Sequence, residues 1–211
     1  MKLKWFGHAC FLITSSEGVR ILTDPFDPSV GYKVPEVEAD IVTTSHDHHD
    51  HNYLKAVKGD FVHFSSPGSF NEKGINIKGI STYHDNEQGK KRGKNVVFVY
   101  EVDGLKVCHL GDLGHILSDE QINEIGPVDV LLLPVGGTYT IDYKQAAVLV
   151  NLMEPKLVIP MHFKTPAMKF PIDNVDKFLA NMSSVQSLGS QELVLDSDFS
   201  TTARVIVMEY E

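Results

Sequence analysis

The amino-acid sequence predicts a single α/β domain, and three observations support this prediction. The chain has 211 residues, of which 42% are hydrophobic and 22% charged, which is typical of a globular protein with a substantial core. Short strand-like runs separated by turns come first, and strand-like and helical segments alternate in the last third. No low-complexity linker or short repeat divides the chain, so residues 1–211 are treated as one domain.

The N-terminal part contains short apolar runs that are bounded by turn signals. Residues 15–18 (SSEG) and 24–28 (DPFDP) are typical turn sequences, because glycine, proline and aspartate favour turn backbone conformations. Residues 52–57 form one or two helical turns in this interpretation. The predicted strands are 2–6, 10–14, 19–23, 39–45, 60–65 and 74–81.

A β-hairpin is predicted over residues 95–112. Two apolar runs with alternating pattern flank Asp103-Gly104, and Asp-Gly is a strong signal for a two-residue hairpin turn. Cys108 lies in the second run, and Cys10 lies in an earlier strand. Two isolated cysteines give no disulfide framework and no metal-pair spacing, so we expect both to be small buried residues in a reducing compartment.

The C-terminal part alternates between buried strands and helices. Residues 128–136 and 156–162 are continuous apolar runs, which are typical of strands buried on both faces. A helix is expected from Ser118, a good N-cap, to Gly126, and a second is expected over 140–155, where Pro155 ends it. The remaining predictions are a helix over 173–182 and strands over 192–197 and 203–210.

The charge and the absence of apolar segments exclude several classes of partner. A net charge of −9 disfavours nucleic acid or an anionic membrane as a general partner, because either would require a basic face. No run approaches the length of a membrane-spanning helix, and residues 1–14 lack the features of a signal peptide. We therefore expect a cytoplasmic protein that acts on a small molecule.

Residues 45–52 (SHDHHDHN) carry the strongest functional signal in the chain. They follow the apolar pair Ile41-Val42, and they contain the pattern H-x-H-x-D-H. Residues two apart in an extended chain project to the same side, so His46 and His48 can reach one metal ion. Asp50 and His51 come after a turn of the chain and can reach a second ion. Imidazoles and carboxylates are good ligands for zinc, iron or manganese.

The alternative interpretation of this segment is a solvated loop that happens to be rich in histidine. One isolated H-x-H would favour that alternative, but the full pattern directly after a strand favours a metal site. Asp47 and His49 are the outward-pointing residues and are expected at the surface.

Three further candidate ligands stand at the ends of predicted strands. His84 ends the run 79–84, Asp112 follows Gly111 after the hairpin, and His162 ends the run 156–162. Gly111 allows close backbone approach beside Asp112. A carboxylate such as that of Asp112 can lie between two cations and bind both.

These residues resemble the metallo-β-lactamase superfamily of metal-dependent hydrolases. The segment SHDHHDH matches the first metal motif of the family position for position, and His84, GD at 111–112 and PMH at 160–162 follow in the family's order. The resemblance spans the whole chain. The motifs GHA, TDP, HLGD and PMH are most similar to the small members that include ascorbate-6-phosphate lactonase and N-acyl-phosphatidylethanolamine phospholipase D.

The resemblance implies a four-layer αβ/βα sandwich, in which two mixed β-sheets are flanked by helices and the metals lie at one edge. It implies that two divalent ions (zinc, manganese or iron) are bound. One ion would be held by His46, His48 and His84, and the other by Asp50, His51 and His162, with Asp112 as the bridge. Asp50 and Asp112 would also take part in catalysis by helping to handle the proton of the nucleophile.

Other residues have two open interpretations each. Asp24 either accepts a hydrogen bond from a ligand imidazole or is only a turn residue before Pro25. His8 either reaches the edge of the site or makes a structural hydrogen bond. His109 is expected to be a satisfied buried histidine, and His63 and His115 carry no predicted function.

Three residues are candidates for substrate contact. Arg92 lies in the basic segment 90–94 (KKRGK), which either attracts an anionic group or is simply solvated. Tyr139 lies in the segment 136–140 (GGTYT) after a buried strand, and Lys164 follows His162 by two residues. Each could line the pocket.

The function predicted from the sequence is hydrolysis of a small ester, lactone or phosphodiester by metal-bound hydroxide. No G-x-S-x-G motif or convincing serine triad is present, so no covalent intermediate is expected. Two alternatives use the same scaffold: a di-iron redox protein, whose branch would have glutamate in place of His48, and a non-catalytic metal-binding regulator.

Overall fold

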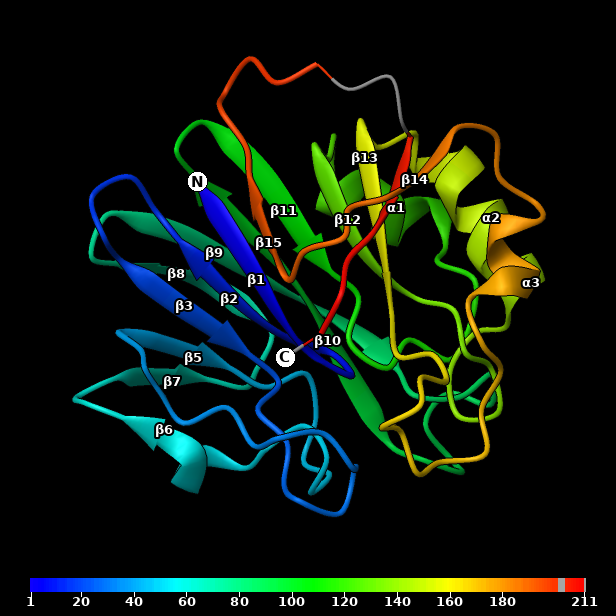
Figure 1. Ribbon diagram of the computed structural model, residues 1–211, viewed down its shortest axis with the longest axis horizontal. Helices are drawn as coiled ribbons and strands as arrows, with labels where there is room; N and C mark the ends of the chain where they lie inside the picture. The colour runs from blue at the N-terminus through cyan, green and yellow to red at the C-terminus, as the bar shows by residue number, and fades with distance from the viewer. Residues whose placement is uncertain (201–203, 211) are drawn as a thin grey trace.

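Two β-sheets lie face to face in the computed structural model, which describes residues 1–200 and 204–210 (Figure 1). In spatial order, the six-stranded sheet contains β15 (Glu192–Val194), β1 (Lys2–Gly7), β2 (Cys10–Thr14), β3 (Arg20–Thr23), β5 (Ile41–Thr43) and β7 (Val62–Phe64). The eight-stranded sheet contains β14 (Val185–Ser187), β16 (Val205–Val207), β13 (Leu157–Met161), β12 (Val130–Pro134), β11 (Leu105–His109), β10 (Lys94–Val102), β9 (Ile75–Tyr83) and β8 (Gly68–Glu72). The predicted α/β fold with two mixed sheets is confirmed.

The main core lies between the two sheets, and it follows from the two-residue alternation of the strands. Trp5, Ile21 and Ile41 belong to this core, whereas their neighbours Phe6 and Leu22 belong to a second apolar cluster. The second cluster covers the outer face of the six-stranded sheet. Strands β12 and β13 are buried at every position, as their continuous apolar runs predicted.

The helices lie beside the eight-stranded sheet, on the side away from the six-stranded sheet (Figure 1). They are α1 (Asp119–Ile125), α2 (Tyr143–Met153) and α3 (Asp176–Leu179). On the outer face of the six-stranded sheet, the layer consists mainly of irregular segments with Phe26, Tyr32 and Met168, near the 3₁₀ turn η1 (Leu54–Ala56) and the strand pair β4 (Val37–Glu38) and β6 (Val57–Lys58). The helical layer that the family resemblance implies for this face is therefore largely replaced by irregular segments.

Helix boundaries follow from side chains that satisfy the free amides of the first turn. Ser118 and Gln121 form a capping box at the start of α1, which ends before Gly126 as predicted. Asp142 and Gln145 form the same arrangement at α2. No helix among the described residues combines the length and apolarity that a membrane span requires.

The helix predicted over 173–182 is shorter in the structure. The Asp173 N–H donates to the Gly136 carbonyl and the Asp173 carbonyl accepts from Lys164, so the Asp173 backbone is committed outside the helix. At the other end, Asn181 and Met182 donate to carbonyls three residues earlier, which is 3₁₀ geometry. Only the central turn is α-helical.

Four strands, β4, β6, β8 and β14, were not predicted, and the start of a fifth cannot be compared. Strands β8 and β14 lie at the two edges of the eight-stranded sheet and carry few buried side chains, so their sequences lack an alternating apolar pattern. Strand β16 lies within the predicted 203–210, and Ala203 is outside the described residues.

Removing the N-cap of α2 should destabilise the protein. In the Asp142→Ala variant the N–H groups of Lys144 and Gln145 lose their acceptor. We expect the free energy of unfolding to fall by about 1 kcal/mol in a denaturant titration. The exposed Val148 of the same helix provides the control, because Val148→Ala should change stability by less than about 0.5 kcal/mol. Equal effects of the two substitutions would contradict this interpretation.

Candidate metal centre

The predicted metal ligands follow strands that run in the same direction and end at one edge of the two sheets. β3 and β5 are parallel, and β1 runs with them because it is antiparallel to β2, which is antiparallel to β3. In the other sheet β11, β12 and β13 are parallel, and β9 shares their direction. The residues that follow these strand ends are His8, Asp24, the segment 46–51, His84, Asp112 and His162.

Three histidines form the first group of the centre. One ring nitrogen from each of His46, His48 and His84 lies within 4.8 Å of the others. His48 is exposed, whereas His84 is buried. The group therefore opens to solvent on the side of His48.

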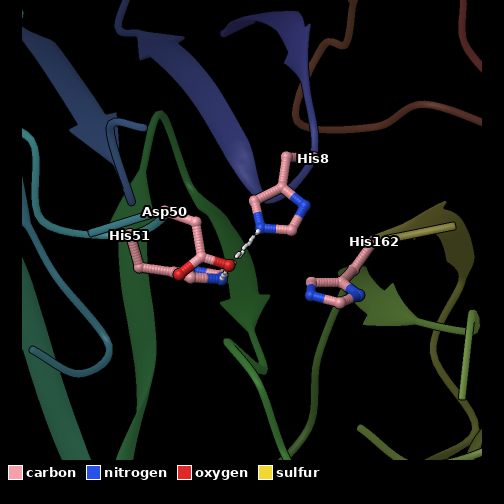
Figure 2. A group of neighbouring side chains, drawn as sticks. All are labelled: His8, Asp50, His51 and His162. Atoms are coloured by element: carbon pink, nitrogen blue, oxygen red, sulfur yellow. Dashed lines mark hydrogen bonds and ion pairs between the residues drawn. The ribbon is translucent and has the colours of Figure 1, made fainter. Parts of the chain in front are cut away.

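A second group is more deeply buried and contains Asp50, His51 and His162. Ligand atoms of these three residues and of His8 all lie within 4.8 Å of one another. His8, the adjacent pair Asp50 and His51, and His162 come from three separate parts of the chain, and Figure 2 shows that their side chains point toward one another. His51 and His162 have 1% or less of their surface exposed.

The buried carboxylate of Asp112 lies between the two groups. Its Oδ1 atom is 3.2 Å from Nε2 of His51, and its Oδ2 atom is 3.2 Å from Nε2 of His84 and 3.3 Å from Nε2 of His162. The structure thus brings together all seven residues predicted as ligands. Their roles in binding metal remain predictions.

The hydrogen bonds of Asp24 orient two of the imidazoles. Asp24 is buried, and its carboxylate accepts from the Ser45 N–H (2.7 Å), the Ser45 hydroxyl (2.6 Å) and Nδ1 of His51 (2.8 Å). Because the Ser45 hydroxyl donates to Asp24, its oxygen accepts from Nδ1–H of His46 at 2.9 Å. Nε2 of His46 then carries a lone pair that faces the centre. Asp24 therefore accepts a hydrogen bond from an imidazole that is predicted to be a ligand, and the metal-binding role of that imidazole stays a prediction.

Asn95 positions the backbone of Asp112, a role that the sequence did not indicate. Its Oδ1 accepts the Asp112 N–H at 2.9 Å, and its Nδ2 donates to Oγ1 of Thr82 (2.8 Å) and to the Leu110 carbonyl (3.0 Å). The one signal available was a polar residue at the start of an otherwise apolar strand. Ser45 was also missed, although it directly precedes the histidine motif.

The donor set fits metal ions. Nε2 of His46 is buried and has no hydrogen-bond partner among the described residues, so its lone pair is unsatisfied. Ligand nitrogens about 2.0–2.1 Å from a tetrahedral zinc ion lie about 3.4 Å apart. The contacts of Asp112 with three imidazoles are close to that separation. Neutral imidazoles and carboxylates are the ligand types that zinc, manganese and iron accept.

A pocket of about 450 Å³ opens onto the centre. Five of the predicted ligands line it: His48, Asp50, His84, Asp112 and His162. The other lining residues are His49, Lys91, Arg92, Tyr139 and Phe170.

Comparisons with known proteins agree with this geometry. The family model of the β-lactamase superfamily domain matches residues 2–162. The chain belongs to the metallo-β-lactamase superfamily. It is 33% identical to a UPF0173 metal-dependent hydrolase of Thermococcus onnurineus over 193 residues, which cover 78% of this chain and 85% of the relative. The corresponding protein of Carboxydothermus hydrogenoformans is 32% identical over 196 residues, with the same coverage.

The chain is also similar to a crystal structure from Thermotoga maritima, whose protein is assigned to the Zn-dependent hydrolases of this superfamily. The match covers 100% of this chain and 99% of that one. The sequence identity is 46% and the TM-score is 0.83. The protein described here is therefore a metal-dependent hydrolase of the metallo-β-lactamase superfamily.

The electrostatics of the hydrolase centre keep most of the predicted ligands in the protonation state that a metal ion would require. Burial lowers the pKa of His46 to about 2, and burial also lowers the pKa of His84, so both imidazoles are neutral at pH 7. Burial raises the pKa of Asp112, but His162 and His51 outweigh it and hold that pKa well below its ordinary value. For His51, burial lowers the pKa, but Asp112 and Asp50 reverse this effect and raise it. The carboxylates thus stabilise positive charge on the His51 ring.

The other predicted residues divide into those at the pocket and those away from it. Arg92 and Tyr139 line the pocket, with the guanidinium 5.5 Å from the centre of the Tyr139 ring. Lys164 does not line it. Its amino group donates to the carbonyls of Met168 and Phe170, so the interpretation of Lys164 as a substrate residue is corrected to that of a loop anchor.

The remaining histidines are placed by hydrogen bonds or by exposure. His109 is buried between the Ala9 carbonyl and the Gly111 N–H, as expected. His63 pairs with Thr44, and His115 pairs with the backbone of Tyr83 and Ile116. His49 is exposed at the pocket, and Asp47 is exposed and accepts from Asn52.

Gly111 should be essential for the centre because its φ is +56° and it has no space for a side chain. An added Cβ would lie 2.4 Å from Cβ of Ser45 and 2.5 Å from Oδ1 of Asn95, the two residues that position His46 and Asp112. We expect overpacking in Gly111→Ala to destabilise the protein by about 1–3 kcal/mol, in addition to the cost of the backbone strain. The metal content measured by elemental analysis should fall.

Gly189→Ala is the matched control for this prediction. Gly189 has a similar φ of +64°, and nothing lies within 4 Å of its added Cβ. This substitution carries only the backbone strain, about 1–2 kcal/mol, and should leave the metal content unchanged. Full metal content in Gly111→Ala would contradict the role assigned to this close approach.

Proposed function

We propose that this hydrolase binds two divalent ions and hydrolyses a small anionic ester, lactone or phosphodiester. The observation that carries the proposal is the position of Asp112, whose carboxylate contacts His84 of the first group and His51 and His162 of the second. Two groups of ligands that share one carboxylate favour two neighbouring ions over a single ion.

The residues divide between the two ions as the family resemblance implies. His46, His48 and His84 would hold the first ion, and Asp50, His51 and His162 would hold the second. The identity of the metal is part of the proposal. Zinc is favoured because the similar protein of Thermotoga maritima is assigned to the Zn-dependent hydrolases, and manganese and iron remain compatible with the ligands.

The ions would supply Lewis-acid chemistry, because a water molecule bound to them is acidified and a substrate oxygen is polarised. The protein's part is to keep Asp112 ionised and fixed by Asn95 and to present Asp50 to the pocket. The Asp50 side chain is 13% exposed, so it can contact an incoming water and accept its proton. We expect water to attack the substrate directly, without a covalent intermediate. We also expect the protein to act in the cytoplasm, as the sequence predicts.

The charge of the pocket rim supports an anionic substrate. Lys91 and Arg92 line the pocket, although Lys91 also pairs with Glu87. Nη2 of Arg92 donates to the Thr138 carbonyl at 3.2 Å, which leaves other guanidinium donors for a ligand. Tyr139 and Phe170 add aromatic surface beside Arg92.

Asp85 fixes this basic rim relative to the metal centre. Its buried carboxylate accepts from the N–H groups of Glu87, Gly89, Lys91 and Arg92 at 2.8–2.9 Å. Asp85 directly follows His84 in the chain. The loop that carries the cations is therefore anchored one residue from a ligand of the first ion, which favours a fixed distance between the scissile bond and the anionic group of the substrate.

The reaction class can be tested with zinc- or manganese-loaded protein on a panel of lactones, phosphodiesters and carboxylic esters, each with and without an added anionic group. We expect one class to be hydrolysed. Turnover should fall by more than about a hundredfold in Asp112→Ala. Substitution of a residue that only hydrogen-bonds to a ligand typically costs about 10- to 100-fold. Asp47→Ala, an exposed aspartate of the same segment as the motif, should keep full activity. No turnover from protein that holds two ions would contradict the proposal and favour a redox or regulatory role.

Arg92 should discriminate between anionic and neutral substrates. A hydrogen bond to a charged group contributes about 1.5–3 kcal/mol, so Arg92→Ala should raise KM for the anionic substrate by about tenfold or more. KM for its neutral analogue should change little. Lys90→Ala removes the same charge from an exposed residue of the same loop that does not line the pocket, and it should have a much smaller effect. Equal effects on both substrates would show that Arg92 has only a structural role.

A further inference from the structure

His8 belongs to the second ligand group by position, although the family's ligand set implied by the sequence does not include it. Its Nε2 atom is 3.2 Å from Oδ2 of Asp50 and 3.0 Å from Nε2 of His51 (Figure 2). Its ring also lies beside that of His162, with 4.3 Å between the ring centres. The residue has no exposed surface and is not part of the pocket lining.

Hydrogen bonding alone does not account for both close contacts of His8. A ring nitrogen carries either one proton or one lone pair. If Nε2 of His8 donates its proton to Asp50, it has neither a second proton nor a lone pair for Nε2 of His51. That atom is nevertheless only 3.0 Å away. A cation placed between these atoms would satisfy all of them, since ligand atoms on one zinc ion lie about 3.4 Å apart in tetrahedral geometry.

The backbone also holds His8 in this place. His8 forms the turn between β1 and β2 with a φ of +52°, a conformation that costs free energy for a residue with a side chain. Its carbonyl accepts the His162 N–H at 3.1 Å and Nε1–H of Trp5 at 3.2 Å. The hairpin turn is thus tied to the strand end that carries His162.

His8 resembles two family ligands in its other ring nitrogen. Nδ1 of His8 is buried without a hydrogen-bond partner among residues 1–200 and 204–210, and the same holds for Nδ1 of His84 and of His162. In all three residues Nε2 is the nitrogen that contacts other members of the centre. The pattern around His8 therefore matches that around two residues already expected to bind metal.

We propose that His8 is an additional ligand of the second metal ion. The inference rests on the two-ion centre proposed above. With His8, Asp50, His51 and His162, the second position has four protein side chains before the shared Asp112 is counted, whereas the first has three. A position with four protein ligands is closed, and an incompletely filled one can take water or substrate. The second ion would then be held tightly, and the first, beside the exposed His48, would exchange more readily.

The direct test uses full-length protein loaded with cadmium-113 and labelled with nitrogen-15 histidine. A one-bond coupling between cadmium and a ring nitrogen identifies a ligand irrespective of activity. We expect six coupled histidines, with the His8 signal assigned by its loss in His8→Asn. Asparagine tolerates positive φ and so should retain the turn. If that variant does not fold, contacts of the His8 ring with Phe26 and Phe170 assign the signal in the unmodified protein.

Metal affinity gives a second measurement. Chelator competition should show that His8→Asn weakens the tighter of the two ions by tenfold or more and affects the weaker ion less. His63→Asn is the control, because His63 is a partly buried histidine that bonds Thr44 outside the centre. It should leave both affinities unchanged.

The outcomes separate this inference from the function on which it rests. Two bound ions with only five coupled histidines, and an uncoupled His8, would overturn the role of His8 and leave the two-ion centre standing. Coupling of His8 in a protein that holds one ion would support the ligand role and contradict the two-ion proposal. If the protein binds no cadmium and no zinc, both proposals fall.

Discussion

The burial of the Asp112 carboxylate among imidazoles is the constraint on which the rest of the centre depends. A buried charge is costly unless it is paired, and the groups available around Asp112 are His51, His84 and His162. Each of these follows a strand or segment from a different part of the chain. They can meet at Asp112 only because strands of both sheets run in one direction and end at a common edge. The fold thus concentrates polar groups where the backbone leaves the sheets.

Local backbone strain accompanies this convergence. Asp24, His162 and His8 have φ values of +41°, +50° and +52°, which are uncommon for residues with side chains. Each costs about 1–3 kcal/mol and persists only where the surroundings determine the conformation. The surroundings here are strand pairing on one side and side-chain hydrogen bonds on the other, such as those from Ser45 and His51 to Asp24. The apolar core between the sheets therefore supplies the stability that holds strained residues in place.

The sequence predicted the elements of the centre that depend on local pattern. The motif at 46–51 and the strand ends before His84, Asp112 and His162 could be identified because each lies next to a strong apolar run. The contacts of His8, Asn95 and Asp85 could not be identified in this way. They depend on pairing between strands distant in sequence, or on a loop whose shape is set by its backbone N–H groups.

The errors in the fold have the same origin. The 173–182 segment has helical periodicity, but the backbone of Asp173 is used in tertiary hydrogen bonds with Gly136 and Lys164, and the helix starts later. Lys164 follows the predicted ligand His162 by two residues, yet the chain leaves strand geometry after β13, so the alternation of faces no longer applies. Sequence periodicity is informative within an element, and it fails at the element ends where this centre is built.

The two sides of the centre have different physical environments, and this difference explains how one scaffold can serve different substrates. His8 and His51 lie behind the pocket, where the hairpin turn and the ring of Phe26 enclose His8, so change there would disturb packing and charge balance together. The side of His48 faces the pocket, whose rim comes from the loop held by Asp85 and from the segments of Tyr139 and Phe170. Loops of this kind can change without altering the sheets. Selectivity is therefore expected to reside in the rim, and bond cleavage in the sheet edge that the strand directions fix.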